Sequence, residues 1–124
     1  MSKSGDCVES VRRDFKEMMK DGQIFRIKII GGAVGGDREV RQIVIIDRPT
    51  SSNGIWQVQT GVIGSILSLT YLHKIKMAEN GIISGFRKVS GKRAHVTDIV
   101  LNRIVRIEGF SACGQVFRKY YEEE

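Results

Sequence analysis

The chain has 124 residues, of which 41% are apolar, and it carries 20 basic and 14 acidic side chains, for a net charge of +6 and a pI near 9.6. This length suits one domain, and the apolar content excludes a disordered polypeptide. The longest apolar stretch, Gly61 to Leu72, is too short and too rich in Ser and Thr to span a bilayer, and no signal-peptide pattern opens the chain. We therefore expect a soluble, intracellular, cytoplasmic or nuclear protein with a single domain over 1–124.

The residue types that usually carry catalysis or bind metal are few and scattered. Cys7 and Cys113 lie far apart outside any CxxC pair, and His73 and His95 are isolated, which does not fit the ligand spacing of a zinc site. HExxH and GxSxG motifs are absent from the sequence. A pair of Cys113 with a histidine, formed only by folding, is the remaining catalytic alternative. We expect reduced thiols, no metal, no cofactor and no enzymatic activity.

Residues 1–22 are expected to form a helix. Ser4 or Asp6 suits its start, and Gly22 follows the last basic residue, as a helix stop often does. The apolar positions recur at helical spacing and define one buried face, formed by Val8, Val11, Phe15, Met18 and Met19. The charged positions are expected to be an ordinary solvated surface, and they include Arg12, Arg13, Lys16 and Glu17.

After the helix the apolar residues alternate with polar ones. Residues 23–30 and 38–47 both show the period of a half-buried strand, so we expect an antiparallel hairpin. The segment between them, GGAVGG at 31–36, matches neither GxGxxG nor a P-loop and is followed by a strand pattern. We interpret it as the hairpin tip and not as a nucleotide site.

The middle of the chain contains one clear strand and one ambiguous segment. Residues 48–54 are typical of a turn, and residues 55–63 alternate as a third strand. Residues 65–77 fit one long strand, and they fit a helix less cleanly. We expect the strand, with His73 as a packed, hydrogen-bonded residue.

The last third contains further hairpin signals. Asn-Gly at the end of the turn 78–81 predicts a hairpin, and a second turn is expected near Ser90-Gly91. Residues 96–107 fit a helix capped by Thr97 or a strand, and their β-branched content favours the strand. The chain should end in a strand or short helix and an acidic tail at 120–124.

These elements together predict an α+β fold. We expect the N-terminal helix to pack on a mostly antiparallel, strand-rich sheet of roughly five to seven strands, with the strand-rich core at 23–119. A strand–helix–strand rhythm is absent from the sequence, which argues against a parallel Rossmann-type sheet.

The positive charge is concentrated late in the chain. Residues 71–119 hold ten basic and three acidic side chains, whereas residues 1–70 hold ten basic and eight acidic ones. Within this segment, GFRKVSGKRAH at 85–95 contains four cations and no acid. Clustered Lys and Arg bind phosphates as point charges and as forks, and His adds charge at mildly acidic pH. The predicted site consists of Lys74, Lys76, Arg87, Lys88, Lys92, Arg93 and His95, with Arg103 and Arg106 as possible additions.

The chemistry of this site suggests a polyanion without naming it. We expect a non-enzymatic protein that contacts the phosphate backbone of RNA or single-stranded DNA, with RNA favoured, as a homo-oligomer. Trp56, Tyr71, Phe86 and Phe110 are not interleaved with basic residues as in an RRM, so they are expected to pack in the core. The alternative is a structural, viral-matrix-like assembly protein that docks on an anionic membrane surface.

Overall fold

The structure, a computed structural model, describes residues 3–35, 38–101 and 103–121. In these ranges one helix, α1 (Lys3–Lys20), precedes nine strands: β1 (Ile24–Gly35), β2 (Arg38–Asp47), β3 (Trp56–Val62), β4 (Ser68–Leu72), β5 (Lys74–Met77), β6 (Ile83–Val89), β7 (Lys92–Ile99), β8 (Ile104–Ser111) and β9 (Val116–Tyr120). The predicted α+β class is confirmed. The strand count exceeds the expected five to seven because two predicted segments each divide between two strands.

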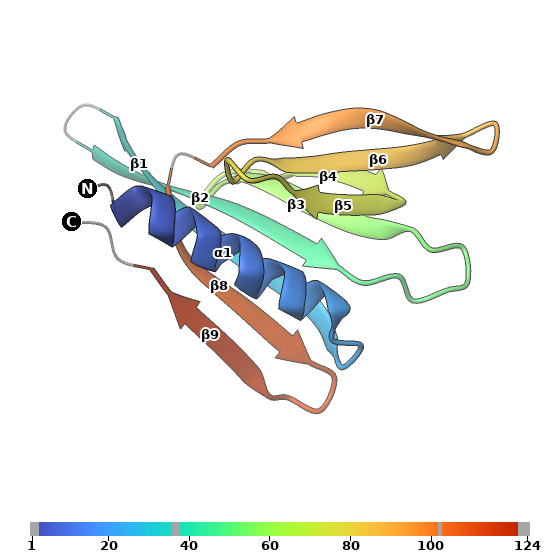
Figure 1. Cartoon of the computed structure of the whole chain (residues 1–124), viewed down its shortest axis with the longest axis horizontal. Coiled ribbons are helices and arrows are strands. Elements are labelled where there is room, and N and C mark those ends of the chain that lie inside the picture. Colours follow the sequence, from blue (N-terminus) through green and yellow to red (C-terminus); the bar gives the residue numbers. More distant parts are fainter. Residues whose placement is uncertain (1–2, 36–37, 102, 122–124) are drawn as a thin grey trace.

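The strands form two antiparallel sheets. The large sheet has the order β4-β3-β2-β1-β8-β9, and the small sheet has the order β5-β6-β7. Helix α1 lies across the large sheet and beside β5, one of the two edge strands of the small sheet (Figure 1). The β6–β7 hairpin extends away from the helix, and residues 87–93 at its end are exposed.

The core lies between the helix and the inner faces of both sheets. Val11, Phe15 and Met18 from α1 belong to one buried cluster with strand residues such as Ile29 and Ile83. Each such side chain contributes roughly 1.5–3 kcal/mol through removal of its apolar surface from water. The helix is thereby fixed to both sheets.

The helix ends at Lys20, two residues before the predicted end at 22, and a residue other than Gly22 stabilises this end. Gly22 does not adopt a left-handed backbone. Instead Arg48, which follows β2, donates from Nη2 to the carbonyls of Met19 at 2.9 Å and Asp21 at 3.0 Å, and from Nε to Ile24 O at 2.8 Å. Met19 lies in the last turn of the helix, where a carbonyl has no intrahelical donor, so the guanidinium supplies one and also links the helix end to Asp21 and to Ile24 of β1.

The prediction of a glycine loop at 31–36 was wrong for most of its length. Strand β1 continues to Gly35, which pairs with Arg38, and residues 36–37 lie outside the described residues. Glycine is needed here because another backbone segment approaches closely. A Cβ at Gly31 would lie 2.9 Å from the carbonyl oxygen of Arg103, and Gly32 N donates to that oxygen at 2.7 Å.

The strand predicted at 65–77 is interrupted at His73. Its first part is β4 in the large sheet, and its second part is β5 in the small sheet. His73 holds the crossing, because its N–H donates to Phe86 O at 2.8 Å and its Nδ1 accepts from the Lys88 N–H at 3.1 Å. The expectation of a hydrogen-bonded His73 is thus confirmed, although the side chain is only half-buried.

The segment 96–107 divides in the same way. It forms the end of β7 in the small sheet and the start of β8 in the large one. The predicted turns at 78–81 and at Ser90-Gly91 are confirmed, and Ser90 and Gly91 have φ values of 53° and 78°. Two successive positive φ values match the twist of a tight hairpin.

Gly85 is a position where a side chain would disrupt the packing of the two sheets. A Cβ there would lie 2.5 Å from Leu72 Cδ1 and 3.0 Å from Thr97 Cγ2, and Leu72 is fully buried. We expect Gly85→Ala to lower the free energy of unfolding by about 2 kcal/mol, because an overpacked core must shift. Urea denaturation measures this loss. Gly22→Ala, where nothing lies within 4 Å, is the matched control, and equal stability of the two variants would contradict the packing described.

Candidate functional site

Five of the nine predicted site residues project from one face of the small sheet. Directly opposed residues of antiparallel strands share a face. Lys74 opposes Phe86, Phe86 opposes His95, and Lys88 opposes Arg93. Lys76 lies two residues after Lys74 and therefore on the same side. We call the surface formed by Lys74, Lys76, Lys88, Arg93 and His95 the basic face; it is turned away from the core, where Ile75 and Met77 point.

A β-bulge places His95 on this face. The pairing of β6 with β7 shifts between Gly85 and Phe86, so that one extra residue separates His95 from Asp98. As a result, His95 Nε2 lies 2.7 Å from Asp98 Oδ1, and the Ser84 hydroxyl donates to the same oxygen at 3.0 Å. The His95 hydrogen bond, and then that of Ser84, lower the pKa of Asp98 below its ordinary value of 3.8. His95 is therefore the member of the basic face that has a carboxylate partner.

The pKa of Asp98 is expected to rise when His95 is replaced by Ala, because the largest cause of its depression is removed. The folded pKa of Asp98 lies below the unfolded one. Its carboxylate therefore stabilises the fold above about pH 4, and this contribution is lost as the pH falls through the folded value. Carboxyl NMR titration of both proteins measures the change. A smaller rise is expected for Ser84→Ala, and an unchanged midpoint in His95→Ala would rule out the contact.

Arg87 and Lys92 belong to the same hairpin but alternate to its other side. Arg87 donates from Nε to Tyr71 O at 3.1 Å, which directs it toward β4. Lys92 opposes Val89 near the exposed tip. The four cations at 85–95 therefore surround the end of one hairpin. Lys88 and Arg93 lie on one side of it, and Arg87 and Lys92 lie on the other.

Arg103 and Arg106 do not join this group. Arg106 lies on β8 in the large sheet, and its Nε is 3.2 Å from Glu108 Oε2, as an ion pair without the alignment of a hydrogen bond. Arg118 donates to the same Glu108 oxygen at 3.0 Å. Arg103 lies just before β8, beside Gly32 of β1. The chain passes from the small sheet to the large one between β7 and β8, so neighbours in sequence are separated in space.

The helix contributes three cations that do not belong to the predicted site, and two of them, Arg12 and Lys16, were expected to be ordinary solvated residues. Arg12, Lys16 and Lys20 line one side of a groove of about 460 Å³ between α1 and β5, and Lys74 and Lys76 line the other side. The sequence does contain a signal for them, because Arg12, Lys16 and Lys20 are spaced four residues apart and therefore lie along one side of the helix. Lys74 and Lys76 belong to both surfaces, so the groove continues the basic face.

The cations of the basic face and the groove are largely unneutralised. Within the described residues, none of Lys16, Lys20, Lys74, Lys76, Lys88 and Arg93 forms an ion pair with a carboxylate. Arg12 is held by a hydrogen bond from its Nε to Met77 O at 3.3 Å. Asp98 shares the basic face, but its carboxylate is bonded to His95 and Ser84. The remaining like charges form an excess that produces a field attractive to anions.

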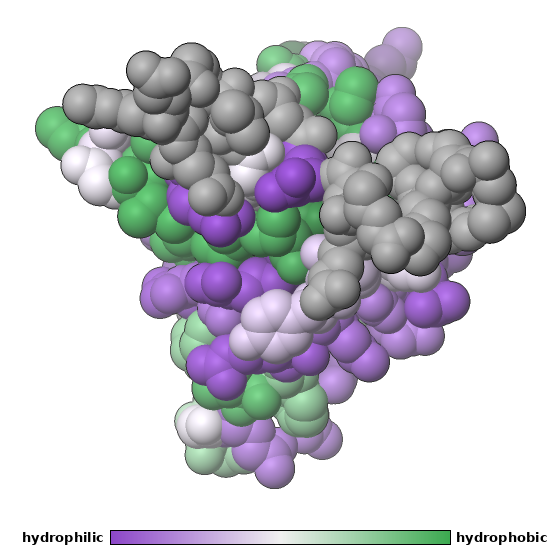
Figure 2. Space-filling model, turned by 90° about the vertical axis from the view of Figure 1, so that its left-hand side faces the viewer, coloured by the Kyte–Doolittle hydropathy of each residue, from purple (hydrophilic) through white to green (hydrophobic). Residues whose placement is uncertain are grey.

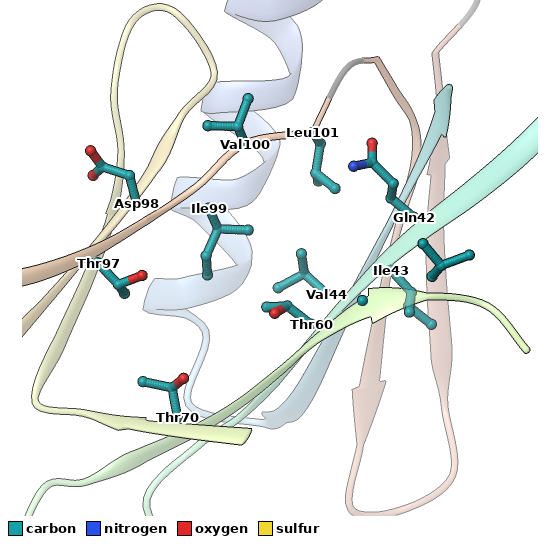
Figure 3. Close-up of a pocket in the computed structure, with 12 residues that line it drawn as sticks. Gln42, Ile43, Val44, Thr60, Thr70, Thr97, Asp98, Ile99, Val100 and Leu101 are labelled. Atoms are coloured by element: carbon teal, nitrogen blue, oxygen red, sulfur yellow. The ribbon is translucent and has the colours of Figure 1, made fainter. Parts of the chain in front are cut away.

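A second cavity, of about 290 Å³, lies between the two sheets (Figure 3). Thr97, Ile99 and Leu101 face Thr60 and Thr70 across it. Among the described residues that line it there is no Lys or Arg, and their single acid, Asp98, turns its carboxylate away toward His95. The cavity therefore lacks the charge that would hold an anion.

Two further properties bear on the class of protein. In the described part of the chain, no helix has the length and apolarity needed to cross a membrane, and no three His, Cys, Asp or Glu side chains are grouped so that they could hold a metal ion. Comparisons with protein-family models, with curated proteins and with solved structures found no match to this chain.

Proposed function

We propose that this protein is a non-enzymatic basic protein that binds the phosphate backbone of RNA or single-stranded DNA through the basic face. The observation that carries the proposal is the gathering of Lys74, Lys76, Lys88 and Arg93 on one solvent-facing surface without carboxylate partners among the described residues. Phosphates are bound by such groups through charge and hydrogen bonds, without reading the sequence of bases.

An aromatic side chain at the centre of the basic face favours a single-stranded nucleic acid over a membrane surface as the ligand. Phe86 is half-buried among the cations and meets the His95 ring edge-on, with centroids 5.6 Å apart. Its remaining surface offers a base a place to stack. By contrast Ile83, three residues before Phe86 on the same strand, is 0% exposed and packs in the core, so it offers no apolar surface to a lipid.

The experiment that tests the proposal compares three ligands at low salt. Fluorescence anisotropy is measured with labelled single-stranded RNA and DNA of equal length, and co-sedimentation is measured with phosphatidylserine vesicles. We expect both strands to bind and vesicles to bind more weakly. Binding to vesicles alone would replace the proposal with the membrane alternative, and binding to none of the three would overturn both.

Self-association of the protein would bring several copies of the basic face together, and the edge strand β9 could form the contact between copies. β9 is an edge strand of the large sheet, all of its side chains are exposed, and Phe117 and Tyr120 are 44% and 67% exposed. Hydrophobic and hydrophilic residues are interspersed on the end of the molecule where α1 begins and β9 ends (Figure 2). An open edge of this kind can pair with a second copy, so we expect a homo-oligomer, which light scattering measures.

A further inference from the structure

The groove between α1 and β5 combines two kinds of surface. Its floor is apolar and is formed by Phe15, Met19, Ile75 and Met77. Its two rims carry cations from different elements, described above. The cations of α1 recur at steps of about 6 Å along the helix, and Lys74 and Lys76 are separated by about 7 Å along the strand. The groove is therefore suited to a ligand with an apolar body and more than one negative charge.

The edge of β5 adds hydrogen-bonding groups to this groove. β5 pairs with β6 on one side only, and its other side faces the helix. The carbonyl of Met77 on that side accepts from Arg12. Polar backbone groups beside an apolar floor fix the orientation of a small flat ligand, as in most binding pockets.

We infer that the groove receives one nucleotide of the bound strand, with the base over Met19 and Ile75 and the adjoining phosphates at Lys16, Lys20 and Lys74. This inference deepens the proposed function and rests on it, because the strand reaches the groove from the basic face through the shared Lys74 and Lys76. A thioether and lysine stems are favourable partners for an aromatic face. The ligand is then single-stranded, because a duplex keeps its bases paired and stacked, and extracting one costs a few kcal/mol.

The test uses the wild-type protein and three ligands. These are a strand of roughly twelve nucleotides, the same strand annealed to its complement, and a strand in which the central nucleotides are abasic. The intact and the abasic strand carry the same number of phosphates, and the duplex carries about twice as many, so charge alone would favour the duplex. We expect the intact strand to bind at least about fivefold more tightly than the abasic strand, because stacking of a base is lost, and more tightly than the duplex.

Substitutions in the groove then test whether the difference in affinity among these ligands arises there. Lys16→Ala with Lys20→Ala should weaken binding of the intact strand roughly tenfold and lower the salt dependence by about one unit per lysine. Met19→Glu should weaken binding more than Met19→Gln, which has a similar size without the charge. The matched control is Lys119→Ala, because Lys119 is exposed on β9 at the other edge of the fold.

The outcomes separate the two proposals. Equal affinity for the intact, abasic and duplex ligands would overturn the groove inference and leave backbone binding intact. Absence of binding to all three at low salt would overturn the proposed function itself. Loss of binding in Lys119→Ala equal to that in the groove variant would show a diffuse charge effect and would also overturn the groove inference.

Discussion

Replacing Arg48 with Ala is expected to lower the free energy of unfolding by about 3 kcal/mol, because charge-assisted hydrogen bonds to backbone carbonyls are lost together. Arg48 joins the C-terminal end of α1 to the start of β1 through Met19, Asp21 and Ile24. Its guanidinium also lies over the Trp56 ring, 4.9 Å from the centroid, which adds a cation–π contact. Urea denaturation followed by circular dichroism measures the loss.

Two comparisons identify the cause of this loss. Arg48→Lys keeps the charge but not the planar fork, so it should recover less than half of the stability. Lys119→Ala removes an exposed cation without a described partner and should change stability by less than about 0.5 kcal/mol. Full stability in Arg48→Lys would show that charge at the helix end, and not the fork, holds the helix.

Removing four cations from the basic face is expected to weaken binding of single-stranded RNA at least about a hundredfold near physiological salt. The variant replaces with Ala the residues Lys74, Lys76, Lys88 and Arg93. These side chains are exposed and form no ion pair within the described residues, so the thermal transition should move little. Anisotropy titrations and thermal melts of the same samples separate the two effects.

A charge-preserving variant is the matched control for this experiment. It exchanges Lys for Arg at positions 74, 76 and 88 and Arg for Lys at position 93, and we expect its affinity to stay within a few-fold of wild type. Unchanged binding in the Ala variant would remove the basic face as the site. A large drop in melting temperature would mean that these side chains support the fold.

Much of the fold was predictable, because period-two alternation and turn residues are local signals. Strands β1, β2 and β3, the helix, and the turn at Ser90-Gly91 follow from the pattern of apolar residues and glycines. The break in the strand at His73 was not predictable, because no Gly or Pro next to His73 signals it. The interruption depends instead on hydrogen bonds to Phe86 and Lys88, which are distant in sequence. The prediction of a loop at Gly31 and Gly32 was wrong for a related reason, because both glycines lie against the distant backbone of Arg103 and not in a turn.

The candidate site was predictable in part. A charge excess in one segment correctly indicated that the cations of β5 and of the β6–β7 hairpin lie close together in the fold. The charge excess could not show that Arg106 lies apart from these cations. Arg106 is close to them in sequence, but it lies on the large sheet beside Glu108. The charge excess also left out Lys16 and Lys20, because helix cations are ordinarily solvated and only packing against β5 makes them part of a groove.

We propose that the unneutralised cations of the small sheet act together on one chain of phosphates. The measurement that tests it most directly is the affinity of the wild-type protein for a single-stranded RNA as a function of salt concentration. Contact with about six phosphates predicts a slope of about −4 for the logarithm of the association constant against the logarithm of salt. A slope near zero, or no binding at the lowest salt, would contradict the claim.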